Sequence, residues 1–160
     1  MSKIRLGVAG ANGAFGIKHL EALRAISDVD ITAVMATTME KATGVADRFG
    51  VQFRFDDYDT FIASDRVDAI ILATPTQLHA EQGIKAMAAG KHVLVEIPMA
   101  DNLADSERLV AKQAETGLVG MVGHVRRFNP SHQWVHNEIS KGALSIQQMD
   151  VQTYFFRRTN

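Results

Sequence analysis

Three glycines near the start of the chain, Gly10, Gly13 and Gly16, have a spacing suited to holding a phosphate group. An apolar run at residues 4–9 precedes them, and apolar residues at helical spacing follow over residues 15–26. In such a strand–turn–helix unit, small residues let backbone N–H groups approach a pyrophosphate at the positive end of the helix. The spacing is one residue longer than the common pattern, and a tight packing turn is the alternative interpretation. The predicted dinucleotide cradle consists of Gly10, Ala11, Asn12, Gly13, Ala14 and Phe15.

The end of the next apolar run, residues 31–36, indicates which dinucleotide the cradle prefers. An NAD-binding unit usually carries an acidic residue there, which holds the ribose 2′-hydroxyl. Thr37 and Thr38 take that place here, with Lys41 nearby, and these side chains can hold a 2′-phosphate. The sequence therefore favours NADP as cofactor, with NAD as the other possibility. Because Thr37 and Glu40 also match a capping box, Thr37 can instead serve to begin a helix.

Polar residues also follow two further apolar runs, at residues 67–73 and 92–96. His79, one helical turn beyond the first of these ends, is either a cofactor ligand or a structural histidine. Glu96 ends the second run, where a carboxylate either faces the cofactor or caps the next turn. The predicted cofactor contacts at these two ends are Thr74, Pro75, Thr76, His79, Glu96 and Ile97.

A doubly wound parallel sheet is the fold that gathers such residues, because its ligands lie beyond the carboxyl ends of the strands. Apolar runs alternate with helical stretches up to residue 123, which predicts a Rossmann-like α/β domain with helices on both faces. We place this domain at residues 1–124. Its strands are expected at residues 4–9, 31–36, 52–55, 67–73, 92–96 and 119–123. Its helices are expected to begin at the glycine loop and near residues 37, 57, 77 and 102.

The remainder of the chain, residues 125–160, has a different pattern. A helix at 131–141 is expected to precede a long, partly alternating strand at 146–156. Because a long strand needs a partner, we expect this segment to begin an α+β substrate and oligomerisation domain whose remainder is absent, or to pair with a second copy. Aromatic residues at 154–156 would lie at a sheet edge and favour a homo-oligomer.

Composition excludes several other classes of protein. The 160 residues carry a formal net charge of −1, which gives no signature of nucleic-acid binding, and no uncharged run is long enough to cross a membrane. The absence of cysteine excludes disulfides, thiolate zinc sites and a cysteine nucleophile. His132 and His136 are four residues apart, but no third ligand is evident, so no metal site is predicted. The start of the chain does not read as a signal peptide, and we expect a soluble cytoplasmic protein.

Three segments carry a resemblance to a known family: residues 73–79, 89–98 and 123–130. In this order they resemble the glucose–fructose oxidoreductase / inositol dehydrogenase / MocA family, with the chain matching its nucleotide domain and the start of its substrate domain. The run from Arg126 to His132 and the segment 146–158 further resemble the branch that oxidises 4-carboxy-2-hydroxymuconate-6-semialdehyde. That resemblance implies oxidation of the cyclic hemiacetal to 2-pyrone-4,6-dicarboxylate by NADP during aromatic degradation.

The same resemblance implies roles for particular residues. Arg126 and Arg127 are expected to hold the substrate carboxylates, because guanidinium groups bind carboxylates through forked hydrogen bonds. The alternative is a solvated or interdomain basic pair. His124 and Glu96 are the candidate catalytic residues, with His124 moving the proton. The resemblance implies, as the alternative base, a histidine of the family's C-terminal domain. Ile97 stands where the wider family has a lysine that assists alcohol oxidation, which argues against a sugar or polyol substrate. Such a substrate stays the alternative within the family. A third reading, from a different class, is a non-catalytic module that senses NADP(H).

Overall fold

The computed structural model describes residues 3–152, which divide into two compact units between Gly123 and His124. The first unit contains one parallel sheet with its covering helices, and the second contains a short 3₁₀ turn and one helix.

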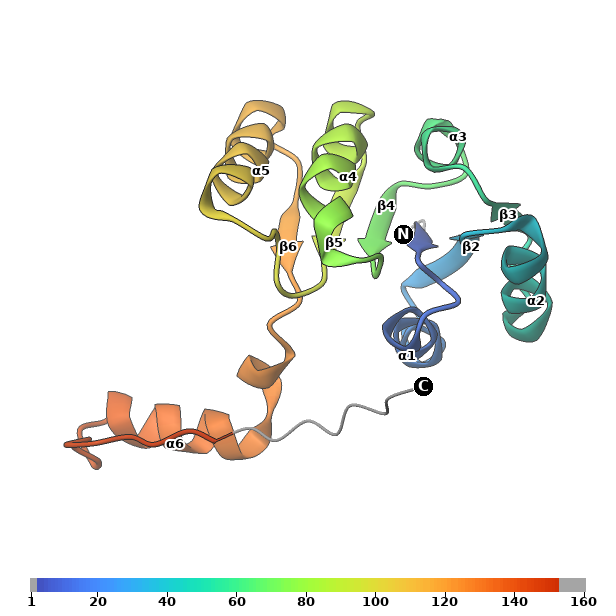
Figure 1. The fold of residues 1–160 in the computed structure, drawn as a ribbon. Coiled ribbons are helices and arrows are strands. Elements are labelled where there is room, and N and C mark those ends of the chain that lie inside the picture. The colour runs from blue at the N-terminus through green and yellow to red at the C-terminus, as the bar shows by residue number, and fades with distance from the viewer. Residues whose placement is uncertain (1–2, 153–160) are drawn as a thin grey trace. The chain divides into compact units, whose positions relative to one another are not determined.

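Within the described residues, the strands of the first unit form one parallel sheet in the order β3-β2-β1-β4-β5-β6 (Figure 1). The chain moves outward from β1 to β3 and then returns to β4 on the other side of β1. The topological switch point, where α/β sheets bind ligands, therefore lies between β1 and β4. The strands are β1 (Ile4–Ala9), β2 (Val29–Met35), β3 (Phe53–Phe55), β4 (Ala69–Leu72), β5 (His92–Val95) and β6 (Gly120–Val122).

Helices cover both faces of this sheet, as a doubly wound fold requires. Residues of α1 and α2 pack with Val8, Val34 and Ile71 on one face. Residues of α3, α4 and α5 pack with Ile70 and Leu72 on the other. Neighbouring β4 residues thus face opposite sides, which is why the whole run is apolar. The helices are α1 (Ala14–Leu23), α2 (Met39–Phe49), α3 (Tyr58–Ala63), α4 (Thr76–Ala88) and α5 (Leu103–Thr116).

The boundaries of these helices follow from their capping residues. Asn102 accepts a hydrogen bond from the Asp105 amide at the start of α5, which confirms the expected cap. Gly117 ends the same helix in the left-handed conformation, at φ 65°, which glycine adopts without strain. Asp57 caps α3 in the same way as Asn102 caps α5. The Rossmann-like fold class expected from the sequence is therefore confirmed, with each predicted strand present and most of them shorter than expected.

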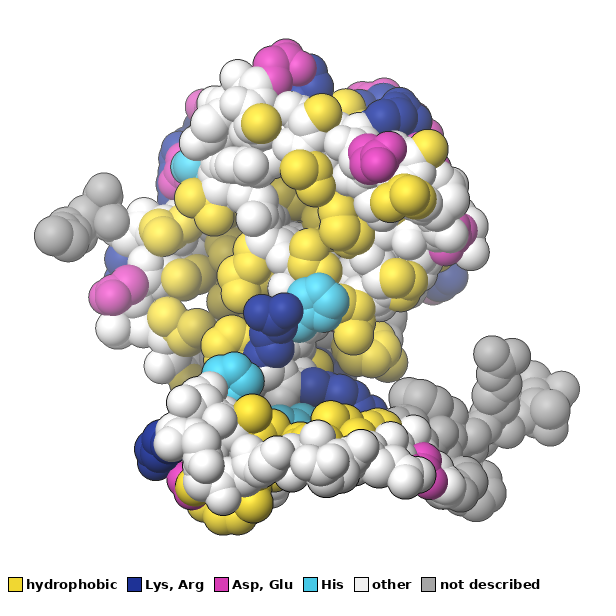
Figure 2. Space-filling view, turned by 90° about the vertical axis from the view of Figure 1, so that its left-hand side faces the viewer, with side chains coloured by type: hydrophobic (Ala, Val, Ile, Leu, Met, Phe, Trp, Pro, Cys, Tyr) yellow, Lys and Arg dark blue, Asp and Glu magenta, His cyan; other side chains and the backbone are white. Residues whose placement is uncertain are grey.

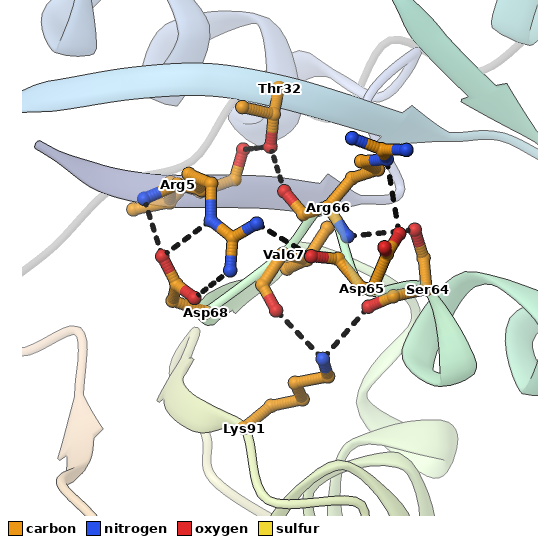
Figure 3. A network of polar contacts seen from close by, with 9 residues as sticks. Arg5, Thr32, Ser64, Asp65, Arg66, Val67, Asp68 and Lys91 are labelled. Atoms are coloured by element: carbon orange, nitrogen blue, oxygen red, sulfur yellow. Dashed lines mark hydrogen bonds and ion pairs between the residues drawn. The ribbon is translucent and has the colours of Figure 1, made fainter.

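The amino edge of the sheet is held by a dense polar network (Figure 3). Arg5 at the start of β1 donates through Nε to Asp68 Oδ2 at 2.9 Å and through Nη1 to the Asp65 carbonyl at 2.6 Å. Lys91 donates to the carbonyls of Ser64 and Val67 at 2.8 and 2.7 Å. These bonds join the segments that precede β4 and β5 to β1. This edge therefore stabilises the fold, while the opposite, carboxyl edge carries the predicted ligand contacts.

Two expectations about apolar residues were wrong. Phe15 and Ile26 belong to the predicted apolar face of the first helix, but they are 65 % and 48 % exposed. Only Leu20 and Leu23 of that pattern are buried, and α1 ends at Leu23, before Ile26. The start of α1 is therefore available to a ligand.

The second unit contains the 3₁₀ turn η1 (Val125–Phe128) and the helix α6 (Pro130–Ser140). The helix confirms the expectation, with Asn129 accepting from two amides of its first turn. Residues 146–152 form no strand, so the predicted strand at 146–156 is wrong over its described part, since no second strand lies beside it to supply hydrogen bonds. The remaining residues of that prediction, including 154–156, lie outside the described residues.

None of the described residues of the second unit is buried. Several large apolar side chains are exposed on η1 and α6, among them Phe128 and Trp134, at 64 % and 60 %. A domain is stabilised by removing such surface from water, so these side chains need further protein to cover them.

Candidate functional site

The glycine loop after β1 lies at the switch point and is pressed against the end of β4. Gly10 has φ +74°, a conformation that favours glycine, and a Cβ at this position would overlap the Ala73 carbonyl. A Cβ on Gly16 would likewise overlap the Gly10 carbonyl. The close approach of this loop to β4 and α1 therefore depends on glycine at both positions.

The first turn of α1 offers backbone N–H groups to an anion. Its N-cap residue is Gly13, and among the described residues no side chain caps this end and no acidic residue lies in the first turn. The Ala11 amide donates to the Met35 carbonyl and the Gly13 amide donates to the Gly10 carbonyl, so neither serves a phosphate. The cradle therefore offers the amides of Asn12, Ala14 and Phe15, with the positive end of the helix dipole behind them. This arrangement fits a pyrophosphate.

At the carboxyl end of β2, the two threonines have separate tasks. The N-cap of α2 is Thr38, whose hydroxyl accepts from the Lys41 amide at 3.3 Å, so the interpretation of Thr37 as the cap is wrong. The Thr37 hydroxyl instead accepts from Lys41 Nζ at 3.3 Å. The helix is therefore capped one residue later than expected. Thr37 and Lys41 lie side by side beyond β2, where an NAD-binding unit has its acidic residue.

His79 lies inside the fold and not on the ligand face. Its side chain is 1 % exposed, with Nδ1 2.9 Å from the Pro98 carbonyl oxygen and Nε2 2.7 Å from the Thr74 carbonyl oxygen. The Thr74 hydroxyl donates to Gln82 Oε1 at 2.6 Å. His79 therefore joins the loop after β4 to the loop after β5, and its ring nitrogens are not available to a cofactor. Pro75 and Thr76 begin α4 at the same edge.

Glu96 directly follows β5 and its carboxylate is buried, at 8 % exposure. One oxygen, Oε1, lies 2.6 Å from Nε2 of His19 on α1, and the other accepts from the Ile97 amide at 3.3 Å. Sequence analysis did not identify His19, because a partner 77 residues away leaves no local signal. Ile97, at the lysine position of the wider family, is 43 % exposed at this edge.

The remaining predicted site residues belong to the second unit. His124 precedes η1 and is exposed. Arg126 and Arg127 in η1 line a hollow together with polar residues of α6, and no acidic side chain lines it. On the face drawn in Figure 2, a dark-blue Lys or Arg side chain lies beside a cyan His side chain. The α6 residues that line the hollow are His132, Gln133, His136 and Asn137.

Two kinds of site are not found in the part of the chain that the structure describes. No three His, Cys, Asp or Glu side chains are grouped so that they could bind a metal ion. No helix over residues 3–152 has the length and hydropathy needed to span a bilayer.

The sheet order, the glycine loop at the switch point and the open start of α1 together define a dinucleotide-binding domain of the Rossmann type. Comparison with known proteins gives the family. The family model described as "Oxidoreductase family, NAD-binding Rossmann fold" matches residues 4–124, and that for "Bacterial oxidoreductases, C-terminal" matches residues 130–160. The chain therefore belongs to the glucose–fructose oxidoreductase / inositol dehydrogenase / MocA family, which confirms the resemblance found in the sequence.

Individual relatives agree with this assignment. The chain is 57 % identical, over 98 % of its length, to half of a 4-carboxy-2-hydroxymuconate-6-semialdehyde dehydrogenase from Sphingobium. A 3-ketoreductase from Actinomadura kijaniata, solved with NADP, is 32 % identical with a TM-score of 0.81, over 89 % of this chain and 45 % of that one. A scyllo-inositol dehydrogenase from Lactobacillus casei, solved with NAD(H), shares the fold at 24 % identity and a TM-score of 0.84, over 89 % and 42 %. The chain thus spans about half the length of the relatives it matches.

Proposed function

We propose that this chain is the cofactor-binding part of an NADP-dependent dehydrogenase. The observation that carries the proposal is the glycine loop at the switch point, where Gly10 admits no Cβ and α1 begins without a side-chain cap. Such a loop accepts the diphosphate of a dinucleotide through main-chain amides. A bound nicotinamide cofactor supplies the hydride acceptor of the reaction.

The choice of NADP is supported by the end of β2. Thr37 and Lys41 are hydrogen-bonded neighbours there, so a hydroxyl and an ammonium group are available to a 2′-phosphate. An ammonium group favours binding of a phosphate dianion, whereas an Asp or Glu at this place would repel it. A solved relative that is 32 % identical carries NADP, whereas a more distant one carries NAD(H).

The substrate we propose is the cyclic hemiacetal of 4-carboxy-2-hydroxymuconate-6-semialdehyde, and its product is 2-pyrone-4,6-dicarboxylate. This choice is supported by the relative that is 57 % identical and bears that dehydrogenase name. Both compounds are dicarboxylates, and Arg126 and Arg127 line a hollow without acidic side chains. Two guanidinium groups can hold carboxylates through paired hydrogen bonds and so orient the ring.

Proton removal from the hemiacetal hydroxyl is the second task of the protein. We assign it in this chain to His124, because imidazole accepts protons near neutral pH. Ile97 cannot assist as the lysine of the wider family does. A hemiacetal hydroxyl is more acidic than that of a simple alcohol, so its oxidation depends less on that lysine. The apolar Ile97 therefore favours the hemiacetal over a sugar or polyol as the substrate.

The test is an assay of a full-length version of the protein with the semialdehyde and NADP⁺. We expect reduced nicotinamide to form, detected by its absorbance, and the Arg127→Gln variant to raise the substrate KM about tenfold while the cofactor KM stays constant. Arg108→Gln is the matched control, because Arg108 pairs with Asp105 on the surface of α5. Absence of turnover with the semialdehyde, combined with turnover of a polyol, would contradict the proposed substrate.

A further inference from the structure

We propose that His19 and Glu96 form a brace that sets the glycine loop at a fixed distance from the nicotinamide half of the site. Glu96 is then a positioning residue and not a catalytic one. This inference rests on the proposed function, because it assumes that the cradle binds a dinucleotide. It concerns how the protein holds the adenosine half and the nicotinamide half of that ligand at a fixed separation.

The contacts of Glu96 leave its carboxylate no room for proton exchange with a substrate. The side chain is 11 % exposed, and its two oxygens face His19 Nε2 at 2.6 Å and the Ile97 amide at 3.3 Å. Gly123, just after β6, lies close to this carboxylate, since a Cβ added there would be 3.2 Å from Oε1. A carboxylate with so little solvent must keep its hydrogen-bond partners, because leaving it unpaired is costly.

The positions of His19 and Glu96 in the fold explain what the brace connects. His19 lies on α1, the helix whose first turn forms the phosphate cradle between β1 and β4. Glu96 follows β5, on the other side of the switch point from β2 and Thr37. Because a dinucleotide crosses the switch point, the half remote from the 2′-phosphate belongs to the side of β4, β5 and β6. The contact between His19 and Glu96 therefore connects the cradle with the strand that supports the other half.

His79 supports the same side of the site independently. Its ring spans the carbonyls of Thr74 and Pro98 and so joins the loops after β4 and β5. The loop that follows Glu96 is consequently fixed to its neighbour, and the pair between His19 and Glu96 connects the end of β5 directly to α1. Removing that pair should let the glycine loop and the end of β5 move relative to each other. The phosphate cradle itself should stay formed.

The test compares two ligands that differ only in the nicotinamide half: NADP⁺ and 2′-phospho-ADP-ribose, which lacks the nicotinamide. Calorimetric titration of the whole chain gives the Kd of each for the wild type and for His19→Ala and Glu96→Gln. We expect both variants to bind NADP⁺ about tenfold more weakly and 2′-phospho-ADP-ribose within twofold of the wild type. His19→Gln should recover most of the NADP⁺ affinity, because its amide can still donate to Glu96.

The matched control is Glu21→Gln, an exposed carboxylate on the same helix that pairs with Lys18. Its Kd values should equal those of the wild type. Equal losses for both ligands in His19→Ala and Glu96→Gln would show a general structural effect and overturn the brace, as would no loss for either ligand. A wild-type chain that binds neither ligand would overturn the proposed function itself, and the brace with it. If His19→Ala fails to fold, its melting curve shows this, and the isosteric Glu96→Gln compared with Glu21→Gln then decides the outcome.

Discussion

The imidazole Nε2 of His19 lies 2.6 Å from Oε1 of Glu96, and this contact joins the first helix to the end of the fifth strand. The sequence presented Glu96 as a candidate catalytic and cofactor-binding residue, since it ends an apolar run before a proline. In the fold, its carboxylate is buried and bonded to the protein itself. The position at the carboxyl edge was therefore foreseeable, whereas the direction of the side chain depended on a distant partner.

Replacing Thr37 by aspartate should change the preferred cofactor. A carboxylate beside Lys41 would bond the lysine and repel a 2′-phosphate, while it could accept from the ribose hydroxyl of NAD. We expect the Kd for NADP⁺ to rise at least tenfold and that for NAD⁺ to fall. Titration of both coenzymes measures this, with Thr37→Ser as the control that keeps the hydroxyl. Unchanged affinity for NADP⁺ would place the 2′-phosphate elsewhere.

Replacing Gly10 by alanine should abolish cofactor binding. The added Cβ would overlap the Ala73 carbonyl in a backbone conformation that alanine rarely adopts, so the loop must move away from β4. Gly44→Ala is the matched control, because a Cβ there meets no atom within 4 Å in a described helix. We expect Gly44→Ala to bind NADP⁺ as the wild type does. Normal binding by Gly10→Ala would contradict the cradle.

Replacing Ile97 by lysine tests the class of substrate in a full-length version of the protein. Ile97 is 43 % exposed at the site edge, so a lysine can replace it without entering the core. We expect less than twofold change in kcat with the hemiacetal, because its hydroxyl depends little on assistance by a lysine. If the kcat/KM for inositol rises more than tenfold and then exceeds the kcat/KM for the hemiacetal, the result would favour a polyol as the substrate.

Acid should weaken the amino edge of the sheet. Hydrogen bonds from Arg5 lower the pKa of Asp68 to about 2, so the carboxylate stays charged in the folded chain at pH values where it protonates in the unfolded chain. Its contribution to the free energy of unfolding is present above the usual pKa and is lost as the pH falls toward 2. Because the side chain is 41 % exposed, we expect only about 1 kcal/mol.

The measurement is chemical unfolding at several pH values between 5 and 2, for the wild type and Asp68→Asn. The variant lacks the charge, so its stability should fall less steeply over this range. Parallel curves for the two proteins would show that another carboxylate accounts for the acid sensitivity. Asp28→Asn is the control, because Asp28 has no ion-pair partner among the described residues.

The sequence was most informative where a pattern is local. Apolar runs predicted the strands, the start of α5 was expected near residue 102, and the Gly10 loop was found from spacing alone. It was less informative where tertiary contacts decide. The capping box indicated Thr37, but the helix is capped one residue later, by Thr38, which accepts from the Lys41 amide. His79 could be a ligand by spacing, and only the fold shows that it is buried, with its ring nitrogens facing the carbonyls of Thr74 and Pro98.

The expected strand at 146–156 shows a further limit of sequence patterns. Alternation indicates a strand that has one buried face, yet residues 146–152 form none, because hydrogen bonds to a second strand must come from elsewhere. The alternating pattern of a segment therefore indicates a preference for strand, and whether a strand forms depends on a second strand that supplies its hydrogen bonds.

The central claim is that main-chain amides of Asn12, Ala14 and Phe15 hold the diphosphate of a nicotinamide dinucleotide. Calorimetric titration of the wild-type chain with NADP⁺ and with NAD⁺ tests it most directly. We expect saturable binding with one site per chain and a lower Kd for NADP⁺ than for NAD⁺. Absence of heat and of any rise in melting temperature with either coenzyme, in a chain that melts cooperatively, would contradict it.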